Sequence, residues 1–394
     1  MRNFVPFLLI LFLIAAVLRI DFFFTIAYLF FAIYLLSRVW TRRVTVQMKA
    51  DRRFTDHAFC GDQVPVEVTV KNNGRLPVPW VEVHESIPVD LASPASYREA
   101  LSLGGREQHR FHYTLNCRKR GYYALGPLTM HTGDLLGVVK AAQMELPSQY
   151  IVVYPRVLPL QKLGLPTHSP LVALPAGTPL FEDPARIIGV RDYQRGDSPR
   201  RIHWTATASA GRLLAKRYQP AIARETLICL DLDQEDYGQR QRYMATELAV
   251  IVAASIANHV IIKERLPVGL ATRAFDPLTG EETRFHLPPR KERAHLMSLL
   301  EVLARAQVET SKQFVESLRR ESTGLSWGAT ITVITGRESE ELFDTLIYLR
   351  RAGFAVSLIL VQPARPSAEL EKRSALMGTP VHRVWNERDL EVLQ

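Results

Sequence analysis

The segment Gly189–Trp204 reads GVRDYQRGDSPRRIHW and gathers four arginines, two aspartates, a tyrosine and a tryptophan around a Gly-Asp turn. Asp197 followed by Ser-Pro is a good helix start, because an aspartate caps free backbone N–H groups and a proline fits the first turn. This predicts a helix on which Arg200 and Trp204 lie one turn apart on the same face. Guanidinium groups suit carboxylates and phosphates, so one interpretation is a surface that docks an acidic partner or an anion.

The same arginines also have a purely structural interpretation. Asp183, Asp192, Asp197 and Glu225 are near enough in sequence to pair with them and to clamp a connector onto the next domain. A tyrosine and a tryptophan in such a segment are more often packing anchors than ligand platforms. The sequence leaves both interpretations open.

The N-terminal residues 1–40 contain two uncharged apolar blocks, Phe4–Leu18 and Phe22–Leu36, separated by Arg19, Ile20 and Asp21. One straight helix through both blocks would be about 50 Å long, whereas the hydrocarbon core of a bilayer is about 30 Å thick. Two transmembrane helices joined by a turn avoid this mismatch and keep Arg19 and Asp21 out of the bilayer centre. Basic residues after the second block place both ends in the cytoplasm by the positive-inside rule. A cleaved signal peptide is the alternative, and the second apolar block argues against it.

The chain has 394 residues and a formal net charge of +9. This charge suits a nucleic acid, an anionic membrane or an acidic protein. No nucleic acid is expected, because the sequence has no helix-turn-helix, zinc-finger or RNA-recognition module and much of the charge follows the apolar N-terminus. Cys60, Cys117 and Cys229 are widely spaced and include no CxxC pair, which predicts free thiols in a reducing compartment.

Behind the hairpin, residues 41–157 alternate apolar and polar side chains in short runs separated by Gly, Pro and Asn-Gly, which predicts an antiparallel β-sandwich. Seven runs are expected to be strands: VTVQMKA, VPVEVTVKN, WVEVHESI, RFHYTLN, YYALGPLTM, LLGVVKA and YIVVYP. Residues 158–224 hold a Pro-rich extended connector and the arginine-rich segment. In residues 225–394, apolar strands alternate with amphipathic helices, the longest over Arg240–Glu264, which predicts a mostly parallel sheet covered on both faces.

These features resemble the bacterial domain-of-unknown-function-fifty-eight family, whose members often accompany MoxR-type AAA+ ATPases. The family pattern R-x-Y-x-x-G-D-x-x-R-x-I-(D/H)-W is carried by Arg191, Tyr193, Gly196, Asp197, Arg200, Ile202, His203 and Trp204. The resemblance implies two transmembrane helices, a β-sandwich and an α/β domain that is a degenerate von Willebrand factor A-like (Rossmann-like) fold. It also implies an AAA+ ATPase as protein partner, at the bacterial cytoplasmic membrane with the soluble domains in the cytoplasm. It implies no known reaction.

Von Willebrand factor A-like domains commonly hold Mg²⁺ on an Asp-x-Ser-x-Ser loop after the first strand, with a threonine and a second aspartate from later loops. The corresponding loop here offers Asp231, Asp233 and Glu235, which is a partial match. The later loop reads Ile334-Thr335-Gly336, where an Asp-Gly is expected, and Thr272 is a loose candidate for the threonine. Oxygen ligands at the carboxyl edge of a parallel sheet suit a divalent cation. Carboxylates at this position are also common as helix caps.

The sequence has no GxSxG, Walker, HExxH or dinucleotide-binding motif, so no catalytic residue is assigned. The expected function is a non-enzymatic, membrane-anchored interaction or scaffold protein that works with an AAA+ ATPase in cell-envelope or complex-assembly processes. The alternative is a metal-assisted hydrolase centred on Asp231, Asp233 and Glu235. A basic nucleic-acid binder at the membrane is a weaker third hypothesis.

Overall fold

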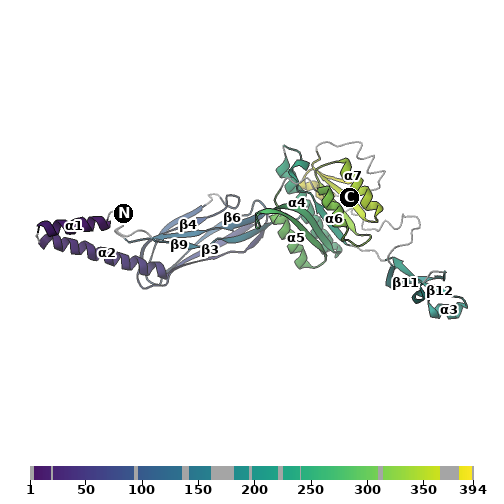
Figure 1. The fold of residues 1–394 in the computed structure, drawn as a ribbon, viewed down its shortest axis with the longest axis horizontal. Coiled ribbons are helices and arrows are strands. Elements are labelled where there is room, and N and C mark those ends of the chain that lie inside the picture. The colour runs from purple at the N-terminus through teal and green to yellow at the C-terminus, as the bar shows by residue number, and fades with distance from the viewer. Residues whose placement is uncertain are drawn as a thin grey trace. The chain divides into compact units, whose positions relative to one another are not determined.

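The computed structural model describes residues 4–18, 21–92, 96–134, 142–160, 182–194, 198–220, 225–239, 241–308, 314–363 and 381–392. The chain divides into two units, Met1–Arg156 and Val157–Gln394. Figure 1 labels their helices and strands. Most of the predicted connector, residues 161–181, lies outside the described residues, as does the expected strand LLGVVKA at residues 135–141.

The first unit begins with two helices, α1 (Phe4–Leu18) and α2 (Asp21–Gln47). They run antiparallel, because Phe7 lies edge-on to Phe30 and Phe12 to Phe24, each pair with ring centroids 5.9 Å apart. The outward side chains are exposed and apolar, as is typical of a surface that faces lipid; they include Leu9, Val17, Phe22, Leu29 and Leu36. By length and composition α2 is able to cross a membrane, whereas the 15 residues of α1 are fewer than the usual 20 or so.

Ten strands in three sheets follow α2 in the described part of this unit. The sheets are β1 (Met48–Arg53), β3 (Gln63–Asn72) and β6 (Gln108–Asn116); β2 (His57–Phe59), β10 (Gln149–Tyr154) and β7 (Gly121–Leu125); and β5 (Ser96–Leu103), β4 (Val78–Ser86), β8 (Leu128–Thr132) and β9 (Ala142–Leu146). Alternating apolar residues set which face of β3 lies in the core. Val64, Val66, Val68 and Val70 are buried, while Lys71 is exposed. One apolar core joins the three sheets.

Three expectations for this unit are wrong in detail. The run YYALGPLTM was expected to be one strand, but it forms β7 and β8 in two different sheets. The run VTVQMKA was expected to be a strand, but its first four residues continue α2 to Gln47, and β1 begins at Met48. Helical spacing allows Thr41 and Val44 to pack on the sheets from one face of α2, with Met48 following at the start of β1. The sheets are also not wholly antiparallel, because β2 pairs with β10 in parallel.

A buried ion pair lies inside the β-sheets. Nη2 of Arg52 is 2.5 Å from Oε1 of Glu85, and both side chains are fully buried. Nη1 of Arg52 also donates to the backbone oxygen of Leu125 at 3.1 Å. Burial raises the pKa of Glu85 even though the charge of Arg52 opposes that shift. Desolvation therefore outweighs the attraction between the partners, and the pair fixes how β1, β4 and β7 meet more than it adds stability.

The second unit contains a six-stranded mixed sheet in the order β15-β14-β13-β16-β17-β18. Its strands are β13 (Thr226–Leu230), β14 (Val268–Asp276), β15 (Glu281–Arg290), β16 (Thr330–Thr335), β17 (Ala355–Val361) and β18 (Val381–Val384). Neighbouring strands pair in parallel except at β15, which is antiparallel to β14. Every residue of β13 and β17 is buried, as expected for parallel strands covered on both faces.

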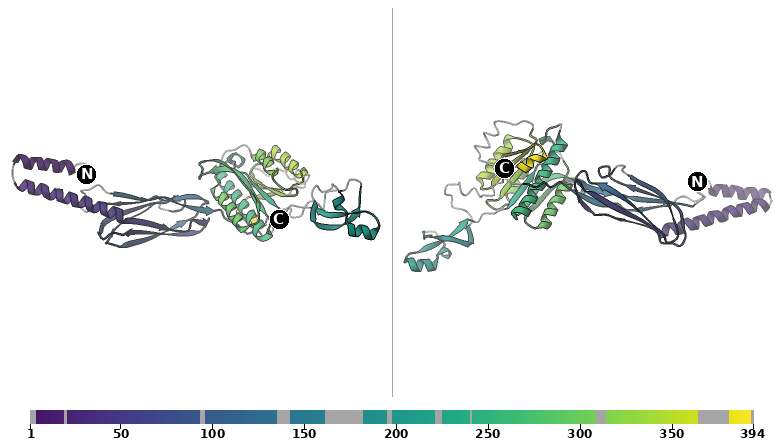
Figure 2. Two further views of the ribbon diagram at one scale, coloured as in Figure 1. Left: turned by 60° about the horizontal axis from the view of Figure 1, so that its bottom comes forward. Right: turned by 180° about the vertical axis from the view of Figure 1, so that it is seen from behind.

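Helices cover both faces of this sheet (Figure 2). They are α4 (Arg242–Asn258), continued by the π-helix η4 (His259–Glu264), α5 (Arg293–Arg305), α6 (Phe314–Ser322) and α7 (Glu340–Arg351). Helix α4 packs against α5, and α6 packs against α7. The stretch Arg242–Glu264 is long and apolar enough to cross a membrane, but 78% of it is buried inside the unit, so it is a core helix. The predicted helix over Arg240–Glu264 is confirmed in type, with a π-helical last part.

The buried ion pair gives a test of the first unit. Replacing Glu85 by Leu leaves the Arg52 guanidinium buried without a counter-charge, so we expect the free energy of unfolding to fall by about 3–5 kcal/mol. The double variant Arg52→Met, Glu85→Leu should recover most of that loss, because it removes both desolvated charges. Thermal unfolding of the full chain in detergent, followed by circular dichroism, measures both.

The matched control is Glu82→Leu. Glu82 lies on β4 with Glu85 but pairs with the exposed Arg98 of β5, so this change should leave the melting temperature nearly unchanged. A double variant as unstable as Glu85→Leu alone would contradict the account of the pair.

Candidate functional site

The signature segment folds around a two-stranded hairpin, β11 (Glu182–Asp192) and β12 (Leu214–Pro220). A 3₁₀-helix, η2 (Pro199–Arg201), and the short helix α3 (Trp204–Ala210) lie between the strands. We call these four elements the signature module. Two backbone hydrogen bonds hold the segment between the strands against the start of β12. Tyr193 N donates to Leu213 O at 3.0 Å, and His203 N donates to Leu214 O at 2.8 Å.

The predicted helix from Asp197 through Trp204 is wrong. Gly196 and Asp197 lie outside the described residues, and Arg200 belongs to η2 while Trp204 begins α3. Ile202 separates η2 from α3. Its backbone is extended and forms a β-bridge with Ala215 of β12, and its side chain is only 8% exposed. Arg200 and Trp204 therefore do not share one helical face.

His203 caps the helix instead. Its Nδ1 accepts a hydrogen bond from the backbone N–H of Ala206 at 3.2 Å, at the N-cap position of α3. This satisfies one of the donors that a helix start leaves free. At the other end Gly211 takes a left-handed conformation, with φ of 64°, and ends α3. His203 therefore has a structural role in the described geometry.

Trp204 projects from the signature module with 67% of its surface exposed. Elsewhere in the module, Leu213, directly before β12, and Val190 of β11 are 48% and 43% exposed. Arg200 is also exposed, and Arg212 has only a loose, solvent-exposed ion pair with Asp192 at 3.4 Å. The module thus presents an indole and aliphatic side chains among guanidinium groups.

The predicted clamp is only partly visible in the described residues. Asp192 does pair with Arg212, but Glu225 accepts from the backbone N–H of Ser326 at 2.8 Å within the α/β unit. The side chain of Asp183 and all of Asp197 lie outside the described part of the chain. Arg191 donates to the backbone oxygen of its neighbour Asp192 at 3.1 Å.

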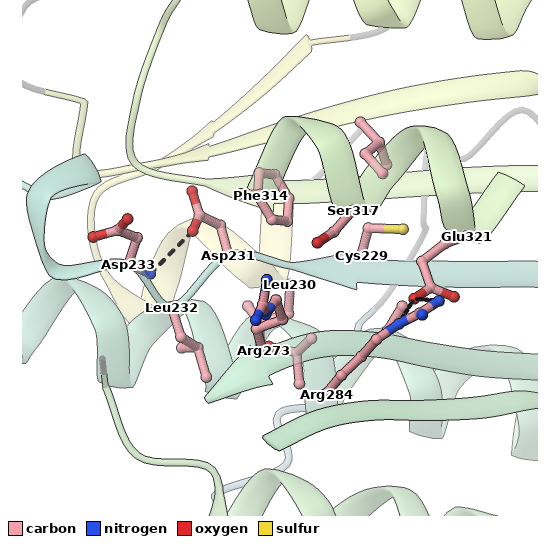
Figure 3. A pocket seen from close by; sticks show the side chains of 13 residues that line it. Cys229, Leu230, Asp231, Leu232, Asp233, Arg273, Arg284, Phe314, Ser317 and Glu321 are labelled. Atoms are coloured by element: carbon pink, nitrogen blue, oxygen red, sulfur yellow. Dashed lines mark hydrogen bonds and ion pairs between the residues drawn. The ribbon is translucent and has the colours of Figure 1, made fainter. Parts of the chain in front are cut away.

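The second candidate site lies at the carboxyl end of β13, where Asp231 is 1% exposed. Its Oδ1 accepts from the backbone N–H of Asp233 at 3.0 Å, and its Oδ2 accepts from the hydroxyl of Thr335 at 2.7 Å. Its backbone oxygen accepts from the hydroxyl of Tyr237 at 2.7 Å. Asp231 therefore links the loop after β13 to the end of β16, beside Asp233 (Figure 3).

The environment of Asp231 makes its carboxyl group a weaker acid than usual. Its pKa lies well above the ordinary value, first because the group is buried and then because of the negative charge of Asp236. A hydrogen bond between these two carboxyl groups favours the protonated form as well. Nη1 of Arg337 lies 2.9 Å from Oδ1 of Asp236. Burial thus favours the protonated form of Asp231, and the guanidinium of Arg337 pairs with Asp236.

Thr335 and Gly336 stand at the end of β16, where an Asp-Gly was expected, so a threonine takes the place of the second aspartate. A Cβ on Gly336 would lie 2.4 Å from a ring carbon of Tyr237 and 2.7 Å from the backbone oxygen of Asp236. The loop after β13 therefore lies too close to this position for any residue larger than glycine.

The three residues predicted to bind metal do not converge on one point. Asp233 uses Oδ1 to accept from the backbone N–H of Glu235 at 2.9 Å and caps the 3₁₀-helix η3 (Gln234–Asp236), while Glu235 is exposed. Among the described residues, no group of three His, Cys, Asp or Glu side chains is placed to hold a metal ion. Thr272, the loose candidate, has a buried hydroxyl with no hydrogen-bond partner in the structure. The arrangement does not fit a magnesium site.

A small hollow adjoins Asp231 and is lined also by Cys229, Thr272, Phe314 and Ser317 (Figure 3). Its volume is about 20 Å³. A cavity needs roughly 10–15 Å³ to admit one water molecule. The hollow is therefore large enough for a single water and too small for an organic substrate.

Sequence reasoning selected Asp231 and Asp233 but missed Asp236, Tyr237 and Arg337. Asp236 and Tyr237 directly follow the loop that was considered, yet nothing local shows that they point back at Asp231. Thr335 and Arg337 become neighbours of this loop only because β16 pairs with β13. Strand order, which the sequence alone did not provide, is the missing information.

The raised pKa of Asp231 predicts a pH dependence. The unfolded chain releases this proton near the ordinary carboxyl pKa of 3.8, whereas the native protein holds it at higher pH. Stability should therefore fall as pH rises above about 4, by up to about 1.4 kcal/mol per pH unit until the native group ionises. In Asp231→Asn this contribution should vanish, so the variant should melt higher than wild type at pH 8.

Melting temperatures of the full chain between pH 4 and pH 8 measure the effect. Asp344→Asn, at an exposed position of α7, is the matched control and should follow the wild-type curve. Parallel curves for wild type and Asp231→Asn would mean that Asp231 is ionised in the native protein.

Solved structures show only faint overall likeness to this chain. The CARDB domain of a Pyrococcus furiosus protein, solved in complex with di-metal ions, is 19% identical over 27% of this chain and 91% of its own, with a TM-score of 0.20. The C-terminal domain of wzt is 12% identical over 28% and 75%, with a TM-score of 0.21. A β-glucosidase from Listeria innocua is 14% identical over 28% and 16%, with a TM-score of 0.18. No curated protein sequence matches the chain.

One family model matches, and its description is "Protein of unknown function DUF58". The match covers residues 189–336, from the end of β11 through the signature module to the glycine after β16. Both candidate sites fall within it. The resemblance inferred from the arginine-rich segment is therefore confirmed: residues 189–336 of this chain are a DUF58 family domain.

Proposed function

We propose that this protein is a membrane-anchored, non-enzymatic scaffold whose signature module docks an acidic surface of a partner protein. The observation that carries the proposal is Trp204, 67% exposed on a small module of the family domain and accompanied by exposed guanidinium groups. The partner class that the family resemblance indicates is a MoxR-type AAA+ ATPase. Cell-envelope or complex-assembly processes are the setting we infer for the pair.

An exposed tryptophan beside arginines is well suited to a protein–protein interface. Tryptophan and arginine are the side chains that most often dominate binding energy in protein interfaces. Trp204 offers a large apolar area, and Leu213 and Val190 are further exposed apolar side chains of the same module. Arg200 and Arg212 would steer an acidic partner and fix its orientation, with part of their effect lost at high salt. The contact would bury the indole that the module itself leaves in water.

For the α/β unit we infer a degenerate von Willebrand factor A-like fold. The support is a parallel sheet with a carboxylate loop after β13 and a threonine at the end of β16 that bonds Asp231. In this interpretation the proton on Asp231 and the guanidinium of Arg337 stand where related sites hold a cation. The unit would then contribute a rigid surface to the scaffold.

The metal-assisted hydrolase remains the alternative, but the geometry supports it less. Both carboxylate oxygens of Asp231 already accept hydrogen bonds, Asp233 caps η3, and Glu235 points to solvent. The hollow beside them admits about one water molecule. Neither a converging ligand set nor room for a substrate favours hydrolysis there.

We infer that α1 and α2 form the membrane anchor and that the β-sheets of the first unit and the whole second unit lie in the cytoplasm. The support is the exposed apolar surface of both helices and the arginines that follow the apolar part of α2. A cleaved signal peptide fits this less well, because α2 continues without interruption into the core of the β-sheets.

The docking proposal predicts a hot spot. Trp204→Ala should weaken binding of a purified MoxR-type ATPase by about 30-fold or more, which is the loss of about 2 kcal/mol typical of such a residue. Arg200→Glu should weaken binding most at low salt, because it reverses a steering charge. Biolayer interferometry with the full chain in nanodiscs at two salt concentrations measures both.

Trp385→Ala is the matched control, since Trp385 is 45% exposed at the end of β18, outside the family domain. Equal affinities for wild type, Trp204→Ala and Trp385→Ala would remove the docking role of the module. Binding of a nucleic acid with a steep salt dependence would instead favour the nucleic-acid hypothesis.

The orientation predicts the behaviour of reporters. A fluorescent protein fused behind Gln394 should be fluorescent in bacterial cells, and alkaline phosphatase fused at the same point should be inactive, because that enzyme needs the far side of the membrane to form its disulfides. Alkaline phosphatase inserted after Ile20, between the apolar blocks, should be active. Active phosphatase behind Gln394 would place the α/β unit outside the cell.

A further inference from the structure

A cleft of about 730 Å³ opens where α2 meets the β-sheets. Its lining comes from the last three turns of α2, from the turn between β3 and β4, and from the turn between β5 and β6. Four arginines are among the lining residues, namely Arg42, Arg43, Arg75 and Arg106. All of these elements belong to the first unit.

Hydrogen bonds hold the two turns in place. Asn72, which is 1% exposed, donates through its side chain to the backbone oxygens of Leu76 and Gly104, each at 2.8 Å. Arg106 N donates to Gly74 O at 2.8 Å, and this joins the two turns directly. Gly105 allows the close approach, since a Cβ there would lie 2.3 Å from Arg75 O. Arg75 and Arg106 therefore extend from a preformed scaffold.

Helix α2 is fixed to the same scaffold. Asn73 N donates to Gln47 O at 3.0 Å, and the indole N–H of Trp40 donates to Pro77 O at 3.2 Å. Val44, 3% exposed, is part of the apolar core of the sheets. The arginines of α2 and those of the turns are thus held on opposite walls of one cleft.

The positive charge of this cleft is not neutralised from within. All four arginines are exposed, and none of them forms an ion pair with a described carboxylate. The neighbouring Glu107 is engaged by the backbone N–H of Gly104 at 2.5 Å. Lys49 of β1 and Lys71 of β3 are directly paired across the two strands. Like charges opposite one another destabilise a sheet, so an anion bound at this end of the unit would be stabilising.

The cleft also lies at a definite height along α2. Leu36 ends the uncharged block, and Arg42 follows six residues later, which is about 9 Å along a helix. The headgroup layer of a bilayer is roughly 5–8 Å thick on each side of the hydrocarbon. The backbone of Arg42 then lies just outside this layer, and the long side chains of Arg42 and Arg43 can extend back along α2 to the lipid phosphates. The exposed Val39 and Val46 add apolar wall on the same segment.

We propose that this cleft binds the phosphate headgroup of an anionic phospholipid in the leaflet that α2 leaves. The guanidinium forks of Arg75 and Arg106 would grip the phosphate from the protein side while Arg42 and Arg43 cover it from α2. The site would set the height and tilt of the β-sheets at the membrane surface. It rests on the proposed anchoring by α2 and not on the proposed docking of a partner.

The test uses the full chain and two lipids. Native mass spectrometry from detergent micelles, titrated with phosphatidylglycerol or phosphatidylcholine, gives the affinity for each headgroup. Wild type should retain phosphatidylglycerol preferentially. The double variant Arg75→Gln, Arg106→Gln should bind it about 25-fold more weakly, at about fivefold for each charge removed near a lipid surface. Both substitutions lie in turns of the sheets, so membrane insertion of α2 is untouched.

The matched control is Arg350→Gln, Arg351→Gln, which removes the same charge from exposed positions of α7 in the other unit and should bind as wild type. Equal binding of the two lipids by wild type, or unchanged phosphatidylglycerol binding by the turn variant with an unaltered melting temperature, would overturn the proposal. A further arm adds 10 mM inorganic phosphate, with chloride at about the same ionic strength as the control. If phosphate displaces the lipid fully and chloride does not, the cleft is a site for free phosphate. A chain that fails to float with vesicles would instead overturn the anchor itself.

Discussion

Helix α2 is continuous, but its first part exposes apolar side chains while its last turns pack against the β-sheets. The organisation of the first unit depends on this change along one helix. Its N-terminal part exposes apolar side chains such as Phe22 and Leu36. Its last turns bury Thr41 and Val44 among the β-sheets, with Trp40 hydrogen-bonded at the point of change. Because the helix is not interrupted, any height or tilt that lipid imposes on α2 is passed to the sheets. The arginine-lined cleft lies where the two surroundings meet.

In the α/β unit the corresponding constraint is the crowding at the carboxyl edge of the sheet. Tyr237 fills the space beside Gly336 and bonds the backbone of Asp231. Burial favours the protonated form of Asp231, and Arg337 pairs with Asp236. The hollow that remains beside Asp231 has a volume of about 20 Å³. On the signature module, by contrast, Trp204 is 67% exposed.

Local patterns were enough for much of the fold and much less for the sites. The alternating valines of β3 and the continuous apolar runs of β13 and β17 specify burial residue by residue, so their strands were predictable. VTVQMKA alternates in the same way, yet contacts with the sheets keep Val44 helical, and no local pattern records those contacts. Arg52 and Glu85 are 33 residues apart, and their pairing follows only from the meeting of separate sheets. The start of α3 was misplaced because Ile202 is drawn into pairing with β12.

The burial of α4 has a consequence for how the chain is made. Arg242–Glu264 is apolar and long enough to be accepted by a bilayer, as α2 is, and differs from it in being enclosed by protein. During translation this segment leaves the ribosome before α5, β16 and β17 exist to enclose it. If α1 and α2 anchor the chain as proposed, the ribosome would be at the membrane when this segment emerges. Correct topology would then require the segment to fold against β13 faster than the membrane takes it up.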